Sequence, residues 1–252
     1  NCDSSQLKSA IRLINKYGKQ RGERGLPKLL PGLNFIAGLN GETSATYDMN
    51  LDLLQEIHNE GLLLRRINIR QVEGEGFQEI DSELFSKFKN TVRNTIDGPL
   101  LEELFPLGER LCNVHWETHD GRTRLAAHQT ESHTGESCRG NAGITFGRQI
   151  GAYPILIGVE YHIPLETQSD IIVTGHGARS ITGVEINLDH NRVSQKQLEA
   201  IPGIGEKTAW KLITQRAKKI RKSGDSNAYE SPMQLFEAAN IDWDSDFSVF
   251  FE

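Results

Sequence analysis

Two alternating pairs of strand and helix patterns place the strongest constraint on how this chain can fold. Residues 33–39 (LNFIAGL) predict a buried strand, and a helical pattern follows from Ala45 to Asn59. Residues 62–72 (LLLRRINIRQV) predict a second strand, and the apolar spacing is helical again from Ile80 to Leu104. Such alternation with buried strands is typical of a parallel α/β sheet or barrel. Two units are too few to close a barrel, so we expect the end of a partial TIM-like barrel.

The pattern changes after Pro106. Short strands and glycine-rich turns run from Leu111 to Ile186, which predicts a small antiparallel barrel or sandwich. Of the two, we expect a small antiparallel β-barrel similar to TRAM or OB domains. Short helices return from Ser194 onward. These changes divide the chain into a barrel end (1–106), a small β-barrel (107–190) and an all-α module (191–252).

Length and composition are ordinary for a folded chain. The sequence has 252 residues, a formal net charge of -6 and 37% hydrophobic residues. No apolar run approaches the roughly 20 residues that a bilayer-spanning helix needs, and no secretory signal pattern is visible. Cys2, Cys112 and Cys138 are odd in number and far apart, which favours a reducing compartment over a disulfide framework. We therefore expect a cytoplasmic protein with no membrane partner.

One segment of this acidic chain is strongly basic. Between Arg192 and Lys222 there are nine lysines and arginines against two glutamates, and local positive charge points to a polyanionic partner. Within it, residues 198–216 (LEAIPGIGEKTAWKLITQR) predict a short helix, a turn with two glycines and a longer helix. Glycines permit a tight turn, and the amides that begin the second helix favour a phosphate.

This segment resembles the helix-hairpin-helix motif, which grips nucleic-acid backbones without reading sequence. The resemblance gives these candidate nucleic-acid-binding residues: Gly203, Ile204, Gly205, Lys207, Thr208, Lys211 and Arg216. Two other interpretations stay open, a plain helical turn with a solvated basic face and a hairpin that docks another protein. The family usually pairs two hairpins, whereas residues 231–242 (SPMQLFEAANID) supply a helix without a second Gly-x-Gly. We therefore expect another surface to assist binding.

Three further stretches resemble the C-terminal half of radical SAM proteins that end in a helix-hairpin-helix. They are LPGLNFIAGLNGET, GLLLRRINIRQV and ITFGRQIGAYPILIGVE. The GLNGET part is similar to the G-[FL]-P-G-E-T that follows the fifth strand of related barrels, with Asn40 in place of proline. In that superfamily this strand lies beside S-adenosylmethionine, so the resemblance implies three cofactor neighbours: Ile36, Gly38 and Glu42.

The second predicted strand has a polar face. Arg66, Asn68 and Arg70 alternate with isoleucines and therefore share one side of the strand. A polar face on a barrel strand is unusual unless it lines a site, so we predict that Arg70 and Gln71 contact substrate or the cofactor carboxylate. The alternative is that these arginines pair with acidic neighbours.

The cysteine motif that holds the iron–sulfur cluster of radical SAM enzymes, Cys-x-x-x-Cys-x-x-Cys, is absent from this sequence. The resemblance implies a parent with a 4Fe-4S cluster and S-adenosylmethionine, with the motif upstream of Asn1, and a fragment that is inactive alone and holds neither cofactor. The parent is expected to modify or dock to nucleic acid, RNA more than DNA. The alternative is a non-catalytic nucleic-acid-binding protein. A partial barrel also leaves sheet edges bare, so we expect self-association or a loosely packed first part.

The middle region carries thiols and imidazoles. Its members are Cys112, His115, His119, His128, His133 and Cys138. Thiolate plus imidazole suits zinc, but no two-cysteine knuckle is present, so we expect surface histidines and predict no metal site. In radical SAM enzymes that modify RNA, a small β-barrel after the catalytic barrel often binds the substrate. Arg148 and Tyr153 are therefore candidates for the assisting surface.

Overall fold

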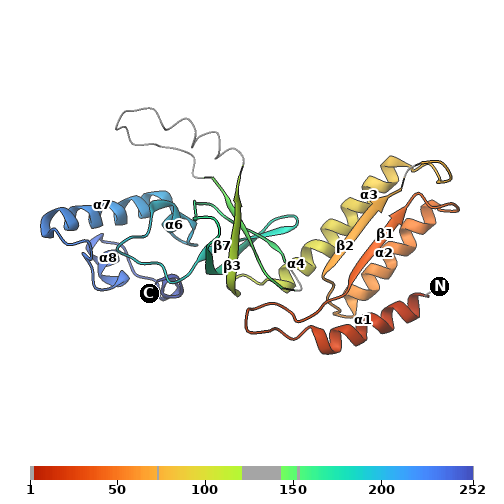
Figure 1. The fold of residues 1–252 in the computed structure, drawn as a ribbon, viewed down its shortest axis with the longest axis horizontal. Coiled ribbons are helices and arrows are strands. Elements are labelled where there is room, and N and C mark those ends of the chain that lie inside the picture. The colour runs from red at the N-terminus through yellow and green to blue at the C-terminus, as the bar shows by residue number, and fades with distance from the viewer. Residues whose placement is uncertain (1–2, 73, 121–142, 152–153, 252) are drawn as a thin grey trace. The chain divides into compact units, whose positions relative to one another are not determined.

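The computed structural model describes residues 3–72, 74–120, 143–151 and 154–251. The chain divides into two compact units, one of residues 1–106 with 151–154 and the other of residues 107–150 with 155–252 (Figure 1). Together they make a mixed α/β protein with a closed five-stranded barrel, so the expected combination of an α/β part and a small barrel is confirmed.

The first unit alternates helices and strands. Its elements are α1 (Ser4–Gly18), β1 (Gly32–Ala37), α2 (Ser44–Asn59), β2 (Arg66–Gln71), α3 (Ser82–Val92), a π-helical turn (Arg93–Asp97) and α4 (Gly98–Leu104). The two strands pair in parallel, with Gly32 opposite Arg66 and Ala37 opposite Gln71. The parallel pairing predicted from strand–helix alternation is therefore confirmed.

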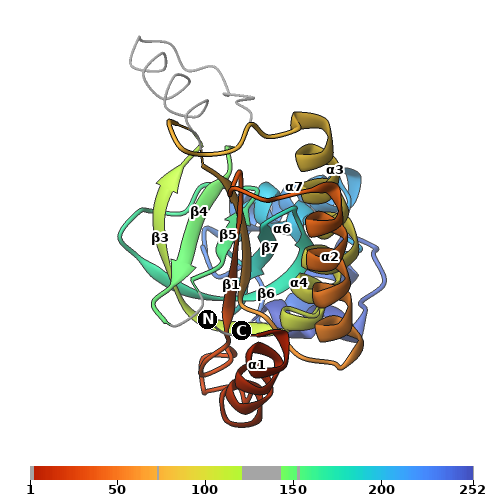
Figure 2. The ribbon, with the colours of Figure 1, turned by 90° about the vertical axis from the view of Figure 1, so that its right-hand side faces the viewer.

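Helices cover one face of the β1–β2 sheet. Leu33 and Ile67 turn toward this face and share a core with Leu54 of α2 and Phe88 of α3. Figure 2 shows α2 and α3 on the same side of β1. Burial of this apolar set is the main source of stability for the unit.

The opposite face of the sheet is polar and open. Arg66 and Arg70 are exposed, and Asn68 donates a 2.8 Å hydrogen bond to Asn34 of β1. Ile36, opposite Arg70, leaves 51% of its surface exposed. The predicted polar face of the second strand is confirmed.

The second unit begins with the barrel. Its strands are β3 (Arg110–His119), β4 (Thr145–Gln149), β5 (Leu156–Val159), β6 (Gln168–His176) and β7 (Ser180–Glu185). They close in the order β3-β4-β5-β7-β6. Four of the five strand pairs are antiparallel, whereas β5 and β7 are parallel. The predicted antiparallel pairing is therefore wrong for this one pair. The reason is that β6 pairs with β3, which leaves β7 beside β5.

The helical part follows the barrel and shares its core. It comprises α6 (Gln195–Ala200), α7 (Glu206–Ser223), α8 (Pro232–Ala238) and a 3₁₀ turn (Ser245–Phe250). One apolar cluster joins Val184 of β7 to Ile201, Ile204, Leu212 and Phe236 of the helical part. The hairpin is therefore anchored by its apolar side. Within the described chain, no helix combines the length and the apolarity of a membrane span.

Candidate nucleic-acid interface

The hairpin consists of α6, a five-residue connection (201–205) and α7. The Ile204 N–H donates to the Ile201 carbonyl at 3.0 Å, which closes the turn, and both side chains are buried. Gly203 has a φ of +90°, a conformation that L side chains rarely adopt, so glycine is required there by the backbone. The predicted short helix, glycine turn and longer helix are thus present, and the side chain of Ile204 belongs to the core of the hairpin.

Gly205 is the N-cap of α7 and leaves the first amides of the helix open. Its φ of -81° and ψ of 170° are available to any residue, and an added Cβ would have no heavy atom within 4 Å. The first helical hydrogen bond runs from the Ala209 N–H to the Gly205 carbonyl, and no side chain caps the helix. The N–H groups of residues 206–208 therefore point away from the helix without an intrahelical acceptor, as an anion site requires.

The basic side chains of the segment fall into two groups. Four of the nine are engaged within the unit: Arg192 pairs with Asp189, Lys196 with Glu199, Arg216 donates to a carbonyl, and Lys219 lies 4.0 Å from the centre of the Tyr229 ring. The other five have no ion-pair or hydrogen-bond partner among the described residues. They are Lys207, Lys211, Lys218, Arg221 and Lys222, all exposed and all on α7.

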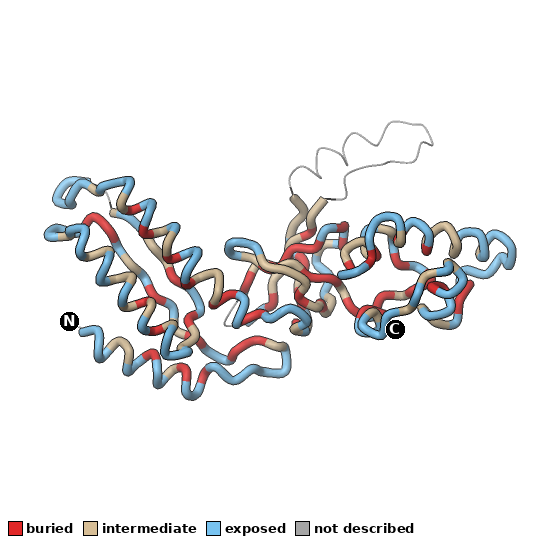
Figure 3. The backbone as a smooth tube through the Cα atoms, turned by 180° about the vertical axis from the view of Figure 1, so that it is seen from behind, coloured by how far each residue is buried: buried red, intermediate tan, exposed pale blue. Residues whose placement is uncertain are grey.

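These five cations share one side of α7. Spacings of four, seven, three and one residues keep them within about 100° of one another around a helix of 3.6 residues per turn. We call them the α7 stripe. They extend over about 22 Å of helix length at 1.5 Å per residue. In Figure 3, exposed residues colour much of this helix pale blue.

Arg216 lies on the other side of the helix. Its Nη1 donates to the His190 carbonyl at 3.1 Å, and burial lowers the pKa of its guanidinium. Arg216 is nine residues, or two and a half turns, beyond Lys207, so the two side chains point in opposite directions. The structure therefore separates Arg216 from the other predicted binding residues, while Gly203, Gly205, Lys207 and Lys211 lie together around the start of α7.

The side of the turn that faces the barrel is acidic. A hollow of about 580 Å³ is bordered by residues 199–205 of the hairpin and by Glu160, Thr174 and Thr182. The hydrogen bond from Lys196 to Glu199 raises the pKa of the lysine and neutralises one carboxylate, whereas Glu160 and Glu206 add negative charge around it. Carboxylates thus lie on this side of the turn, and lysines that are unpaired among the described residues lie on the side of Lys207.

The second predicted site lies at the carboxyl ends of β1 and β2. The Glu42 carboxylate accepts hydrogen bonds from the Gly38 N–H at 2.7 Å and the Leu39 N–H at 3.4 Å, so it closes its own loop. Burial raises the pKa of the Tyr47 hydroxyl, and its hydrogen bond to Glu42 adds to the shift. Gly38 has a φ of +95°, and an added Cβ would lie 2.7 Å from the Val72 carbonyl oxygen.

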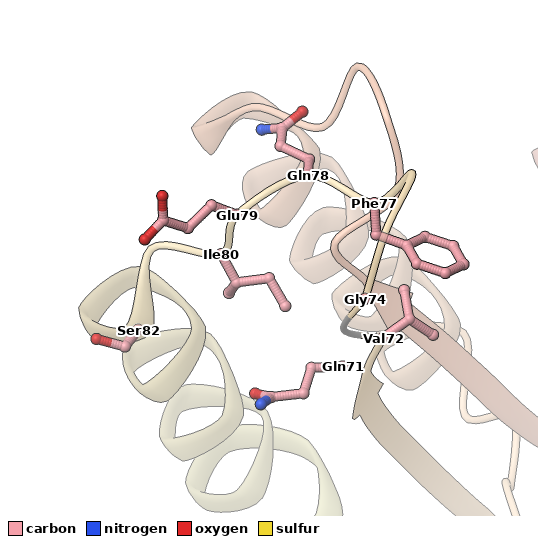
Figure 4. Close-up of a pocket in the computed structure, with 8 residues that line it drawn as sticks. All are labelled: Gln71, Val72, Gly74, Phe77, Gln78, Glu79, Ile80 and Ser82. Carbon is pink, nitrogen blue, oxygen red and sulfur yellow. The ribbon is translucent and has the colours of Figure 1, made fainter.

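The loop after β2 is bound to this first loop through Gln78. Its side chain accepts from the Gly41 N–H at 3.2 Å and donates to the Glu42 carbonyl at 2.8 Å. Beside it is a pocket of about 380 Å³ lined by residues of β2, of the loop and of the start of α3. Figure 4 shows Gln71 and Ile80 turned into this space and Glu79 turned away from it.

The predicted cofactor neighbours therefore differ in whether their side chains are exposed or engaged within their own loop. Ile36 and Arg70 are paired in register on the open face of the sheet, and both are exposed. Glu42 is occupied by its own loop, and Gly38 serves the backbone geometry of that loop. Ile36 and Arg70 therefore present exposed side chains to a ligand, whereas the Glu42 carboxylate is already hydrogen-bonded within its own loop.

The thiol and imidazole group is only partly described, because His128, His133 and Cys138 lie outside the described residues. His119 stacks against His162 with ring centres 4.1 Å apart, and burial lowers the pKa of His162. His115 lies 3.4 Å from Glu166. In the part of the chain that is described, no three potential ligands come together around a point that a metal could occupy.

One of the two candidates for the assisting surface of the barrel is among the described residues. Arg148 forms an ion pair with Glu117 of the neighbouring strand. Tyr153 lies outside the described residues.

Four residues of the α7 surface were not predicted as site residues: the stripe residues Lys218, Arg221 and Lys222, and the exposed Trp210. Helical spacing from Lys207 and Lys211 is the signal that finds them.

Comparison with known proteins places the chain among archaeal relatives. It is 38% identical over 204 residues to an uncharacterised protein of Archaeoglobus fulgidus, which covers 77% of this chain and 34% of that protein. It is 35% identical over 185 residues to an uncharacterised protein of Methanocaldococcus jannaschii, covering 69% of this chain and 30% of that protein. The chain is homologous to the C-terminal part of these proteins and spans about a third of their length. No known protein-family model matches it.

Proposed function

We propose that this chain is the nucleic-acid-binding part of a longer radical SAM protein, in which the hairpin and α7 hold the sugar-phosphate backbone. The observation that carries the proposal is the α7 stripe, five unpartnered cations that begin beside the open amides of residues 206–208. A phosphate chain would supply both the counter-charges and the hydrogen-bond acceptors. Backbone contacts of this kind position a strand without reading its bases.

The barrel is proposed as the second surface. A five-stranded closed barrel is the architecture of the OB fold, whose strands and loops bind oligonucleotides. The barrel and the hairpin share one apolar cluster through Val184 and Ile204. A nucleic-acid strand bound to α7 would therefore remain beside the barrel, which is rigidly attached to the hairpin.

We propose no chemical step at these residues for the cofactors of the proposed parent. S-adenosylmethionine and a 4Fe-4S cluster supply radical chemistry when they are bound, but the three cysteines of this chain lack the ligand spacing of the cluster. Ile36 and Arg70 would lie beside the cofactor, and Glu42 with Gln78 would keep the adjoining loops in shape. The chain is expected to bind its partner and to be inactive alone.

Binding measured against salt tests the proposal. Fluorescence anisotropy of a labelled oligonucleotide should show log affinity falling steeply with log salt, with a slope of about -0.7 per phosphate contact for a single strand. Five contacts give a slope of about -3.5. Replacing Lys207 and Lys211 by alanine should make the slope shallower by about 1.4.

A double variant of two exposed lysines in the first unit, Lys28→Ala with Lys87→Ala, removes the same charge and should leave the slope unchanged. An equal effect of both double variants would contradict a site on α7. A flat salt response would favour a hairpin that docks protein. Iron content of an anaerobically purified full-length relative separates the enzyme from the alternative, a non-catalytic binding protein, because the latter contains no cluster.

A further inference from the structure

Trp210 lies at the edge of the α7 stripe and exposes a large aromatic ring. Its side chain is 59% exposed, and it follows Lys207 by three residues and precedes Lys211 by one. At 1.5 Å per residue, Trp210 is about 4.5 Å further along the helix axis than Lys207. Around the helix it lies about 60° to one side of Lys207 and about 100° to the same side of Lys211, so the ring borders the two cations nearest the hairpin.

The Trp210 ring has no partner in the described chain. The other described tryptophans are engaged: Trp116 is fully buried and donates to the Ser169 hydroxyl, and Trp243 packs edge-on against Phe236. Trp210 makes no ring contact, cation–π contact or hydrogen bond with any described residue. Since a single exposed apolar side chain is common on protein surfaces, the informative feature is its place beside unpartnered cations.

We propose that Trp210 is a stacking platform for an unpaired base, so that the α7 stripe takes single-stranded nucleic acid. This deepens the proposed function and rests on it. Cations along a helix follow the phosphates, and an aromatic ring beside them stacks on the base that the backbone carries. Every base has a flat face, so this contact is tolerant of sequence.

Two features of the stripe favour this partner over the alternatives. Bases of a duplex are stacked inside the helix, so an aromatic side chain on a protein surface cannot reach their faces without unpairing them. A protein partner that covered Trp210 would also bury Lys207 and Lys211, and lysine is depleted from protein interfaces. Charge complementarity therefore selects a flexible polyanion with exposed aromatic rings.

The test compares Trp210→Ala and Trp210→Phe on a single-stranded 12-mer of uridine or thymidine and on a duplex of equal length. Stacking is worth about 1–3 kcal/mol per base when the aromatic ring is replaced by alanine, which is about 5- to 150-fold in affinity. We expect Trp210→Ala to lose that affinity on both single strands, Trp210→Phe to keep most of it, and duplex binding to stay within about twofold of the original chain.

Tryptophan fluorescence gives a readout that a merely structural role would not move. Binding of the single strand should quench the emission of the original chain, and Trp210→Phe should abolish the quench. Val249→Ala, which shortens another exposed apolar side chain of the same unit, serves as the matched control. If the original chain binds with a steep salt response and Trp210→Ala matches it on every probe, the stacking platform is refuted and the proposed function survives. If the original chain binds none of the probes, both fail.

Discussion

Replacement of Gly205 by aspartate should stabilise the hairpin and weaken its binding at the same time. Gly205 is the N-cap of α7, in the extended conformation from which aspartate and serine accept hydrogen bonds of the first helical amides. An added Cβ would meet no heavy atom within 4 Å, so the side chain fits. The aspartate would occupy the same amides that a phosphate is proposed to take.

The two effects have opposite signs and separate magnitudes. Aspartate in place of glycine at an N-cap contributes a few tenths of a kcal/mol through the cap and about 0.3–1 kcal/mol through the helix dipole. Loss of a charge-assisted hydrogen bond to phosphate costs about 1.5–3 kcal/mol, or about 10- to 150-fold in Kd. The slope against salt should also become shallower by about 0.7 for each phosphate that the protein no longer binds.

The assay pairs urea unfolding with oligonucleotide anisotropy over a salt series. Gly205→Ser caps the same amides without a charge and should show a smaller loss of affinity than Gly205→Asp. Ser231→Asp adds the same charge at the N-cap of α8, where the serine already accepts from the Gln234 N–H, and should leave Kd nearly unchanged. A Gly205→Asp protein that is folded and binds with the original Kd and slope would refute an anion site at these amides.

Further predictions concern stability, the role of one arginine and association. Burial raises the pKa of the Glu185 carboxyl, so this group stabilises the folded state in acid, and the stabilisation is lost as the pH rises through the raised pKa. Glu185→Gln should therefore make the free energy of unfolding depend less on pH. Parallel curves for the two proteins would refute this. Gly38→Ala should cost about 1–3 kcal/mol in urea unfolding, and more than Gly41→Ala, whose added Cβ meets nothing within 4 Å. Arg216→Met should lower stability and leave the salt slope unchanged, whereas a shallower slope would return Arg216 to the binding set. The open face and edges of the described β1–β2 sheet should cause self-association, which light scattering measures and a strictly monomeric protein would contradict.

Local patterns predicted the first unit well because they are set by short-range geometry. Strand alternation placed Arg66 and Arg70 on one face, and parallel pairing followed from the intervening helix. The barrel was harder to predict. Its strands are as short as four residues, and nothing in the local pattern of β5 or β7 indicates that they pair in parallel. Which strands become neighbours is decided by closure of the whole barrel.

The candidate sites show the same limit at the level of single side chains. Sequence spacing located the hairpin, its glycines and the first two lysines of the stripe. It could not tell that Glu42 closes its own loop, because that depends on the turn bringing the carboxylate back to the Gly38 amide. Arg216 shares the composition of the basic segment but faces the core, which only the phase of the helix reveals.

Clustering on one side of a single helix separates the α7 stripe from the other cations of the described chain, several of which are paired. Lys8 pairs with Glu56, Arg12 with Glu60 and Arg110 with Asp170, as expected for a protein of net charge -6 that has more carboxylates than cations. Although carboxylates outnumber cations, the positions of these five residues on α7 leave none of them within ion-pair distance of a described carboxylate. Their mutual repulsion disfavours the free protein slightly and is relieved by a polyanion, so the charge arrangement favours the bound state.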